Sequence, residues 1–392
     1  MGHFSELMIS RWETPQLSGL DKFICSECVI DSALQKLVNE NLCSVSCCYC
    51  GEENEDGEVI AAPYDIVMTR IYDSIYKYYA DAQDTDMPRV EKEWLEEETN
   101  IYEIIGEFDP GWSGELCEDL CESSDPSQYL VSHVDNDWSI EDPLSSLSCG
   151  WNSFKKQVLT KTRYLFLAEP EDEFSSGRPD YIPIASMLDA LSNVCKSEQL
   201  LKVIPAGSTF YRVRVSSNAE TTYSTFFDIG VPPVGIASAG RMNPAGISYF
   251  YLASDRETAE KEVVDTASYW SIGKFRSKVD IQVIDFVELP SIPSVFEPDK
   301  YGSKHHISFI YSFVEDLIAP VQKDGKEHVD YVPTQIVSEY FRYKFRNESG
   351  ENILGLRYPS VKNSSGVNLA IFSSENDELE NMFELECIER NC

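Results

Sequence analysis

The sequence predicts an α+β protein in which a helical N-terminal domain with a small zinc-knuckle module precedes a mixed α/β domain. Cysteines cluster in the first 62 residues, apolar residues then recur at helical spacing, and β-branched and aromatic runs dominate after residue 205. We therefore expect a cysteine-rich module at 1–62, a mainly helical domain at 63–204, a mixed α/β domain at 205–375 and an acidic C-terminal tail at 376–392.

The composition restricts the partners of the chain. Its 392 residues carry 67 acidic and 32 basic side chains, which gives a formal net charge of −35. Such a charge repels nucleic acid, whereas a few arginines in a cleft can still bind a small anionic ligand. No apolar run reaches the ~20 residues of a membrane span, and the N-terminus lacks the pattern of a secretory signal. We expect a cytoplasmic protein that binds neither nucleic acid nor membranes.

Helical spacing of apolar residues defines the expected elements of the N-terminal half. One helix is expected at 64–82, directly after Pro63, a second at 94–105, and a third at 183–203. Residues 107–150 are acidic and show no sustained period, so we expect loops there with one short helix.

Four runs of β-branched and aromatic residues predict strands in the C-terminal half. They are FYRVRV at 210–215, ISYFYLA at 247–253, VDIQVIDFVEL at 279–289 and NLAIF at 368–372. Turn-forming residues separate these runs, and Pro205 with Gly207 ends the preceding helix. The change from helical to mixed structure therefore falls near residue 205.

Two Cys-x-x-Cys pairs mark the cysteine-rich module. Their members are Cys25, Cys28, Cys47 and Cys50. Each pair can place two thiolates on one ion, and together they complete the tetrahedral set of a structural zinc site. Cys43 and Cys48 leave the choice of ligands open, and buried free thiols are the alternative explanation. Because four thiolates leave no open position for water, the metal is expected to stabilise the fold and not to catalyse a reaction.

The first candidate binding segment is the strand at 210–215. Alternation along a strand sends Arg212 and Arg214 to one face and Tyr211 and Val213 to the other. Two guanidinium groups on one face can hold a pyrophosphate through paired hydrogen bonds. Solvated arginines on a surface strand are the alternative.

The second segment runs from Gly240 through the strand at 247–253 into a helix. Ser254 with Glu257 three residues later has the pattern of a capping box, which predicts that the helix begins there. Glu262 lies about two turns into this helix. A carboxylate in a cleft beside arginines can stabilise a cationic, oxocarbenium-like ribose. An exposed helix glutamate is the alternative, and it suits the other glutamates of the helix better.

The third segment places Tyr331 before a helix at 336–343 and continues into GLRYPS at 355–360 and the strand that contains Asn368. Hydroxyl and amide groups at these positions can orient a ribose. Structural capping explains Thr334 and Ser360 equally well.

Taken in this order, the segments resemble the RES domain, a family named for its invariant Arg, Glu and Ser. The resemblance covers nearly half of the chain. The matching positions are Arg212 in a strand, 240–243 for the Gly-Arg-aromatic-Asn motif, 251–253 for the Tyr-Leu-Ala strand, 259–262 for the Ala-x-x-Glu helix and 355–360 for the Gly-Ile-x-Tyr-x-Ser motif. Met242 replaces the usual aromatic residue of the second motif.

The resemblance implies an ADP-ribosyltransferase-like fold and cleavage of the nicotinamide N-glycosidic bond of NAD⁺, by hydrolysis or phosphorolysis. It implies a catalytic set of Glu262, Arg212, Tyr251 and Ser360. It also implies an NAD-binding set of Arg212, Arg214, Arg241, Asn243, Tyr251, Tyr331, Ser360 and Asn368. Within these sets, Glu262 would stabilise the developing cation, Tyr251 would position the nicotinamide, and Ser360 would orient the substrate.

The N-terminal half resembles the HEPN/RES N-terminal domain. Ribonuclease HEPN domains use an Arg followed four to six residues later by His, and none of the five histidines has that pattern. Nuclease activity is therefore not expected. The resemblance implies a bacterial toxin or antiphage defence effector that an antitoxin or another regulatory protein restrains, and both domain types tend to form homodimers.

Two other functions stay open from the sequence. One is transfer of ADP-ribose to a protein target, and the other is a non-catalytic, zinc-bearing adaptor. The adaptor is disfavoured because every motif position that can be aligned is filled. A Rossmann-type dehydrogenase is disfavoured more strongly, because no Gly-x-Gly-x-x-Gly lies between a strand and a helix.

Overall fold

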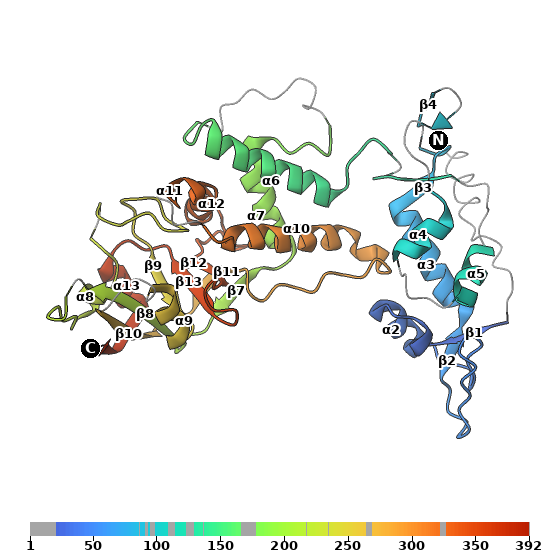
Figure 1. Cartoon of the computed structure of the whole chain (residues 1–392), viewed down its shortest axis with the longest axis horizontal. Helices are drawn as coiled ribbons and strands as arrows, with labels where there is room; N and C mark the ends of the chain where they lie inside the picture. The colour runs from blue at the N-terminus through green and yellow to red at the C-terminus, as the bar shows by residue number, and fades with distance from the viewer. Residues whose placement is uncertain are drawn as a thin grey trace. The chain divides into compact units, whose positions relative to one another are not determined.

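The computed structural model describes residues 21–85, 87–90, 93–94, 99–108, 114–122, 129–135, 137–165, 178–216, 218–233, 235–263, 269–321 and 327–391 (Figure 1). The chain divides into two compact units, Met1–Pro143 with Ile292–His305, and Leu144–Ser291 with His306–Cys392. Among the helices of the described residues, none combines the length and apolar character that a membrane span requires.

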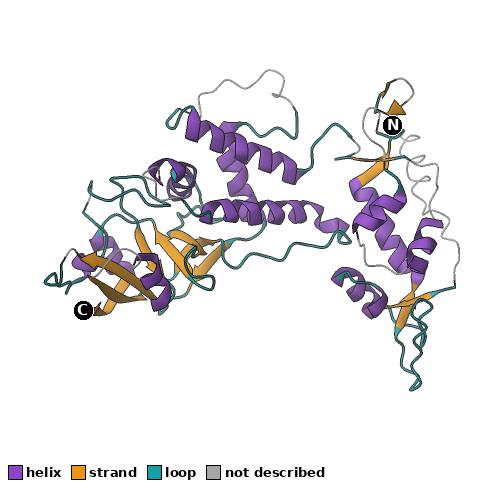
Figure 2. Ribbon diagram, in the orientation of Figure 1, coloured by secondary structure: helices purple, strands orange, loops and turns teal. Residues whose placement is uncertain are grey.

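The first unit contains short strands and helices (Figure 2). In chain order they are β1 (Phe23–Cys25), η1 (Ser26–Cys28), α2 (Ser32–Glu40), β2 (Ala61–Pro63), α3 (Tyr64–Tyr78), β3 (Tyr79–Asp81), β4 (Arg89–Val90), β5 (Glu93–Trp94), α4 (Ile101–Phe108), α5 (Gly114–Glu122), β6 (Leu130–Ser132) and η5 (Pro298–Lys300). Helices α2 to α5 bury their apolar faces in one shared core. This arrangement confirms the predicted helical character of the N-terminal domain.

The predicted helices of this unit are only partly correct. Helix α3 confirms the helix after Pro63, although it ends at Tyr78, where the chain continues as β3. The helix predicted at 94–105 is wrong at its start, because Trp94 lies in β5 and α4 begins at Ile101. The apolar spacing that supports a helix starts only at Ile101, and residues 95–98 lie outside the described part of the chain.

Residues 107–150 contain more helix than predicted. Both α5 and α6 (Pro143–Thr160) begin in this range, where we expected loops with one short helix. Helix α6 buries Leu147, Trp151 and Phe154 at helical spacing. Polar residues between these positions hid the period.

An eight-stranded sheet organises the second unit, in the order β14-β10-β8-β9-β13-β12-β11-β7. The strands are β7 (Leu201–Ile204), β8 (Thr209–Ser216), β9 (Phe250–Ala253), β10 (Tyr269–Ser277), β11 (Ile281–Asp285), β12 (Gly355–Pro359), β13 (Val367–Ile371) and β14 (Phe383–Asn391). All neighbours are antiparallel except β11 and β12. The four predicted strands are confirmed as β8, β9, β11 and β13.

Two segments of this unit differ from the prediction. The helix expected at 183–203 is present as α7 (Met187–Ser197), but residues 201–204 form β7. The segment expected to be an acidic tail at 376–392 contains α13 (Asn376–Met382) and β14. Its acidic residues are compatible with a strand because the adjacent β10 supplies cations: Glu386 forms ion pairs with Lys274 at 2.7 Å and Arg276 at 2.5 Å.

Apolar cores cover both faces of the sheet. Helices α6, α7, α10 (Tyr301–Ile318) and α12 (Val332–Tyr343) contribute to one core together with Ala370. Helices α8 (Phe226–Ile229) and α13 contribute to the other, together with Leu369 and Ile371. The alternation of Leu369, Ala370 and Ile371 between the cores is the period of a strand that is buried on both faces.

Candidate active site

Neighbouring strands of the sheet bring three polar side chains to one face. Tyr358 on β12 pairs with Asn368 on β13, and Ala370, two residues further along β13, pairs with Tyr251 on β9. Paired residues point to the same face, as do alternate residues of one strand. Tyr358, Asn368 and Tyr251 therefore project together, although they come from distant parts of the sequence.

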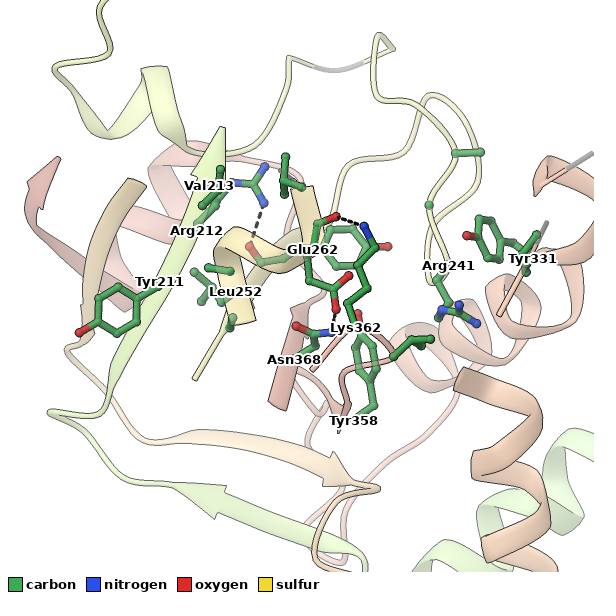
Figure 3. A pocket seen from close by; sticks show the side chains of 18 of the residues that line it. Tyr211, Arg212, Val213, Arg241, Leu252, Glu262, Tyr331, Tyr358, Lys362 and Asn368 are labelled. Atoms are coloured by element: carbon green, nitrogen blue, oxygen red, sulfur yellow. Dashed lines mark hydrogen bonds between the residues drawn. The ribbon is translucent and has the colours of Figure 1, made fainter. Parts of the chain in front are cut away.

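Helix α9 (Arg256–Val263) follows β9 and carries Glu262 in its last turn. Its apolar residues Ala259 and Val263 pack against Val213 of β8. This contact turns Glu262 toward the neighbouring strands, and Figure 3 shows its carboxylate beside Asn368.

The N-terminus of α9 is capped differently from the prediction. Asp255 accepts a hydrogen bond from the backbone N–H of Thr258 at 2.8 Å, so Asp255 is the capping residue. The predicted capping box of Ser254 and Glu257 is wrong, because Ser254 donates its hydroxyl to Asp255 at 3.1 Å.

Two hydrogen bonds fix the carboxylate of Glu262. Its Oε1 accepts from Ser360 Oγ and from Asn368 Nδ2, each at 2.7 Å. The Ser360 hydroxyl is itself oriented, because it accepts the backbone N–H groups of Lys362 and Asn363, each at 3.2 Å. Ser360 is buried and does not line the cavity that Glu262 faces, so it contacts Glu262 from outside that cavity.

A cavity of about 860 Å³ lies in front of Glu262 (Figure 3). Among the described residues, its lining contains three cationic side chains, Arg212, Arg241 and Lys362, and one carboxylate, Glu262. The local charge is thus opposite in sign to the −35 of the whole chain, which favours an anionic ligand. The volume lies within the range of roughly 300–1,000 Å³ that small-molecule sites occupy.

Arg212 bridges two strands at the wall of this cavity. Strands β8 and β9 pair only at Tyr211 and Ala253. Beyond that pair, Arg212 Nη1 donates to the carbonyl of Tyr251 at 2.8 Å, and its Nε donates to the carbonyl of Ile229 at 2.9 Å. Burial, with a smaller effect of Arg214, lowers the pKa of Arg212 to about 10, so the guanidinium stays charged at neutral pH.

Arg214 shares the face of Arg212, as the alternation predicts. Its Nη1 contacts the carbonyl of Gly230 at 3.5 Å, next to the Ile229 carbonyl that Arg212 uses. Arg214 does not line the cavity. The two arginines are therefore neighbours, but only Arg212 reaches the site.

The turn at 240–243 is held by its own asparagine. Asn243 Nδ2 donates to the carbonyls of Ser238, Pro244 and Ile247, at 3.0, 3.1 and 2.7 Å. Its Oδ1 accepts the hydroxyl of Tyr251 at 2.7 Å. Asn243 is buried and outside the cavity lining. The amide that was expected to bind the ligand thus shapes the turn.

Gly240 begins this turn because no side chain fits there. A Cβ at Gly240 would lie 2.5 Å from Asn243 Oδ1 and 2.9 Å from the Tyr251 hydroxyl. The same hydroxyl accepts the backbone N–H of Met242 at 3.1 Å. Tyr251 therefore supports the turn with its hydroxyl while its ring lines the cavity.

Arg241 projects from this turn to the end of α10. It donates to the carbonyls of Leu317 and Ala319 at 2.6 and 3.0 Å, and its guanidinium lies 5.2 Å from the ring centroid of Tyr331. Thr334 on α12 donates to the Arg241 carbonyl at 2.6 Å. A cation at a helix C-terminus is favourable, and stacking on Tyr331 adds to it.

Comparison with protein families identifies both halves of the chain. The family model described as RES domain matches residues 209–386, and the one described as HEPN/RES N-terminal domain 1 matches residues 40–172. The chain is a RES-domain protein. No curated protein and no solved structure matches it. The RES match contains every residue of the expected catalytic and NAD-binding sets.

The RES-domain cavity also contains polar side chains that the sequence did not single out as site residues: Tyr211, His328, Tyr358 and Lys362. Tyr358 lies within the GLRYPS motif and Lys362 two residues after it, so this motif could have identified both residues. His328 lies in a segment without a motif. Burial, with smaller effects of Tyr251 and Glu262, raises the pKa of Tyr358 well above its ordinary value, so its phenol stays neutral.

The second candidate centre of this RES-domain protein is the cysteine cluster of the first unit. The sulfurs of Cys25, Cys28, Cys47 and Cys50 lie within 4.8 Å of one another. Cys25 Sγ is 3.6 Å from the sulfurs of Cys28 and Cys50, and the sulfurs of Cys28 and Cys47 are 3.7 Å apart. Tetrahedral zinc with ~2.3 Å bonds places its sulfurs about 3.8 Å apart, so the four residues fit this ion.

The surroundings of the cluster also suit a metal. Gly51, with φ of +71°, closes the second knuckle by donating to the carbonyl of Cys47 at 3.1 Å. Burial raises the pKa of Cys25 to about 11, a cost that a bound cation removes. Cys43 and Cys48 do not belong to the group of four.

Proposed function

We propose that the RES domain binds NAD⁺ in the cationic cavity and cleaves its nicotinamide N-glycosidic bond, as a toxin or defence effector. The observation that carries this proposal is the one carboxylate among the described lining residues, Glu262, which Ser360 and Asn368 hold in one orientation among three cations. The RES family model is consistent with this use of NAD⁺.

The charges of the cavity match those of the substrate. The diphosphate of NAD⁺ is anionic, and Arg241 and Lys362 offer cationic groups on the cavity lining. Tyr331 and Tyr211 supply aromatic rings for the flat ends of the molecule. Arg212 reinforces the positive field while its hydrogen bonds hold β8 and β9 together.

The proposed step breaks the bond between the ribose carbon and the pyridine nitrogen, and the bonding electron pair leaves with neutral nicotinamide. Positive charge develops on the ribose, and Glu262 stabilises it electrostatically. Water then adds to the ribose carbon and releases a proton, or phosphate adds in its place. In this scheme Ser360 positions Glu262, and Tyr251 shapes the turn that carries Arg241.

The test is product analysis of NAD⁺ incubated with the purified full chain, with and without inorganic phosphate. Nicotinamide with ADP-ribose is expected from hydrolysis, and nicotinamide with ADP-ribose 1″-phosphate from phosphorolysis. Glu262→Gln, which keeps the size of the side chain, is expected to lower the rate by about 10²–10³-fold. Glu257→Gln is the matched control, because Glu257 lies on the same helix, is exposed and pairs with Lys261 at 2.6 Å.

Two outcomes would contradict the proposal. One is intact NAD⁺ with the wild-type protein in every condition, including added cell lysate. The other is equal loss of activity in Glu262→Gln and Glu257→Gln. Label from NAD⁺ retained on protein would assign the activity to ADP-ribose transfer.

We further propose that Cys25, Cys28, Cys47 and Cys50 hold one structural zinc ion. The support is the match between their sulfur separations and tetrahedral zinc geometry. The metal would supply the positive charge that allows four sulfurs to be thiolates in one small cluster.

A further inference from the structure

The loop between β12 and β13 contacts α9 at a second position, one turn before Glu262. Asn363 Nδ2 donates to Thr258 Oγ1 at 2.7 Å, and Thr258 Oγ1 in turn donates to Asp255 Oδ2 at 2.7 Å. Thr258 and Glu262 are four residues apart and therefore lie on the same helix face. The pairs Ser360–Glu262 and Asn363–Thr258 thus join one loop to one helix face at two levels.

The Asn363–Thr258 contact is buried and has a defined direction. Thr258 is 0% exposed and Asn363 is 9% exposed. Lys261 Nζ donates to Asn363 Oδ1 at 3.3 Å, which orients the amide with its Nδ2 toward Thr258. Because buried polar groups are costly without partners, loss of the Thr258 hydroxyl leaves the Asn363 amide nitrogen without this acceptor.

Gly366 allows the loop to approach the helix this closely. A Cβ at Gly366 would lie 2.2 Å from Thr258 Oγ1. The loop is also closed on itself, since Gly366 N–H donates to the Asn363 carbonyl at 2.8 Å and Ser360 N–H donates to the Gly366 carbonyl at 2.9 Å. The hydroxyl of Thr258 is thus enclosed by a loop of fixed shape.

Helix α9 needs such anchors. It has only eight residues, and isolated helices of that length are unstable in water. Its described anchors include the Asp255 cap, the apolar contact of Ala259 and Val263 with β8, and several hydrogen bonds to the loop and to β13. Glu262 lies in the last turn, so its position depends on all of them.

We propose that Thr258 and Asn363, called the clasp below, are positioning residues for Glu262. This inference rests on the proposed NAD⁺ cleavage. Neither residue belongs to the lining of the described cavity. The clasp acts by fixing the separation of α9 from the loop, and hence the geometry of the Ser360–Glu262 hydrogen bond. Loss of the clasp displaces the carboxylate and leaves Arg212 and Arg241, which are held by backbone carbonyls outside this loop, in place.

The decisive variant is Thr258→Val, which removes the hydroxyl at nearly constant volume. The expected result is a fall in kcat for nicotinamide release of about 10–100-fold, as for a misplaced catalytic group, with KM changed less than about twofold. Thr258→Ser restores the hydroxyl and is expected to recover kcat to within about threefold of wild type. Asn363→Ala removes the other half of the clasp and is expected to behave like Thr258→Val.

The matched control is Thr225→Val, which removes the capping hydroxyl of α8. Thr225 Oγ1 accepts from Asp228 N–H at 3.3 Å, and Thr225 does not line the cavity. This change is expected to lower the melting temperature and leave kcat unchanged. If the clasp only stabilises the fold, Thr258→Val should likewise lower the melting temperature and leave kcat unchanged. Thr258→Ser would then give no recovery of kcat.

Hydrogen exchange separates failure of the clasp from failure of the proposed function. Thr258→Val and Asn363→Ala are expected to accelerate exchange across α9 and at the amides of residues 362 and 363, whereas Thr225→Val leaves both unchanged. If the wild-type protein leaves NAD⁺ intact, the proposed function fails. Hydrogen exchange then tests by itself whether the clasp holds α9 against the loop. Wild-type kcat in folded Thr258→Val and Asn363→Ala, or unchanged exchange in both, overturns the clasp.

Discussion

The cysteine cluster of the first unit and the cavity of the RES domain are two sites with opposite constructions. All four cysteines lie between residues 25 and 50, and one ion would complete their arrangement. The cavity collects Arg212, Arg241, Glu262 and Asn368 from a strand, a turn, a helix and a second strand that are distant in the sequence. Local spacing is sufficient to identify the first site, whereas the second depends on long-range pairing.

The two sites also differ in what holds them. The sulfurs of the cluster repel one another when ionised and need a cation. The cavity residues are held by hydrogen bonds within the chain: the guanidiniums of Arg212 and Arg241 each donate to two backbone carbonyls. We therefore expect metal removal to destabilise the first unit. We expect loss of a single hydrogen-bond donor to destabilise the RES domain.

Metal removal should give the largest effect. Replacing Cys25 and Cys28 by serine, or adding a strong chelator, is expected to abolish zinc binding and to lower the free energy of unfolding of the first unit by several kcal/mol. The reason is that structural zinc contributes roughly 10–16 kcal/mol of apparent binding free energy in small zinc domains. Metal content measured by mass spectrometry, together with hydrogen exchange at residues 23–63, provides the readout.

The controls for metal removal are Cys43→Ser and Cys48→Ser, which should keep one zinc per chain. Zinc lost on either of these changes, and retained without Cys25 and Cys28, would show that the ligand set is different.

A smaller effect is expected from Arg212→Lys in the RES domain. Lysine keeps the charge but lacks the planar group that donates to both Ile229 and Tyr251, so one buried carbonyl loses its partner. The expected loss is about 1–3 kcal/mol in the free energy of unfolding, measured by chemical denaturation. Arg214→Lys is the control, since its contact with Gly230 is long at 3.5 Å. Equal losses in the two variants would contradict the bridging role of Arg212.

The smallest effect is expected from Tyr251→Phe. The hydroxyl donates to Asn243 Oδ1 and accepts from Met242 N–H, so its removal should cost about 1 kcal/mol of stability and loosen the turn that carries Arg241. Tyr223→Phe is the control, because its hydroxyl bonds to the Val215 carbonyl at an exposed position where water can replace it. Tyr251→Phe with the stability and NAD⁺ affinity of wild type would argue against this role.

The sequence was sufficient to predict the four cysteines of the metal cluster and part of the fold. The Cys-x-x-Cys spacing predicted the four sulfurs that the structure groups, although spacing alone did not exclude Cys43 and Cys48. Strands rich in β-branched and aromatic residues, such as β8, were predicted well. Helix α6 was missed because polar residues between its buried positions hid the helical period. Strand β14 was missed because its acidic residue Glu386 pairs with cations of β10 that only the fold brings near.

For the cavity, the sequence predicted the residues better than their contacts. Glu262, Ser360 and Asn368 were selected, and the structure joins all three by hydrogen bonds. Asn243 was selected as a ligand-binding residue, but its amide hydrogen bonds lie within its own turn. Such contacts depend on loop conformation and strand register, which residue spacing does not encode.

A double-mutant cycle on nicotinamide release tests whether Ser360 orients Glu262, with rates measured under single-turnover conditions for wild type, Ser360→Ala, Glu262→Ala and the double variant. If Ser360 acts by holding Glu262, Ser360→Ala should lower the rate about 10-fold or more in the wild-type background and change it little once Glu262 is absent. Multiplicative losses in the double variant would show that Ser360 acts independently of Glu262. That result would contradict the proposal that Ser360 acts by orienting the Glu262 carboxylate.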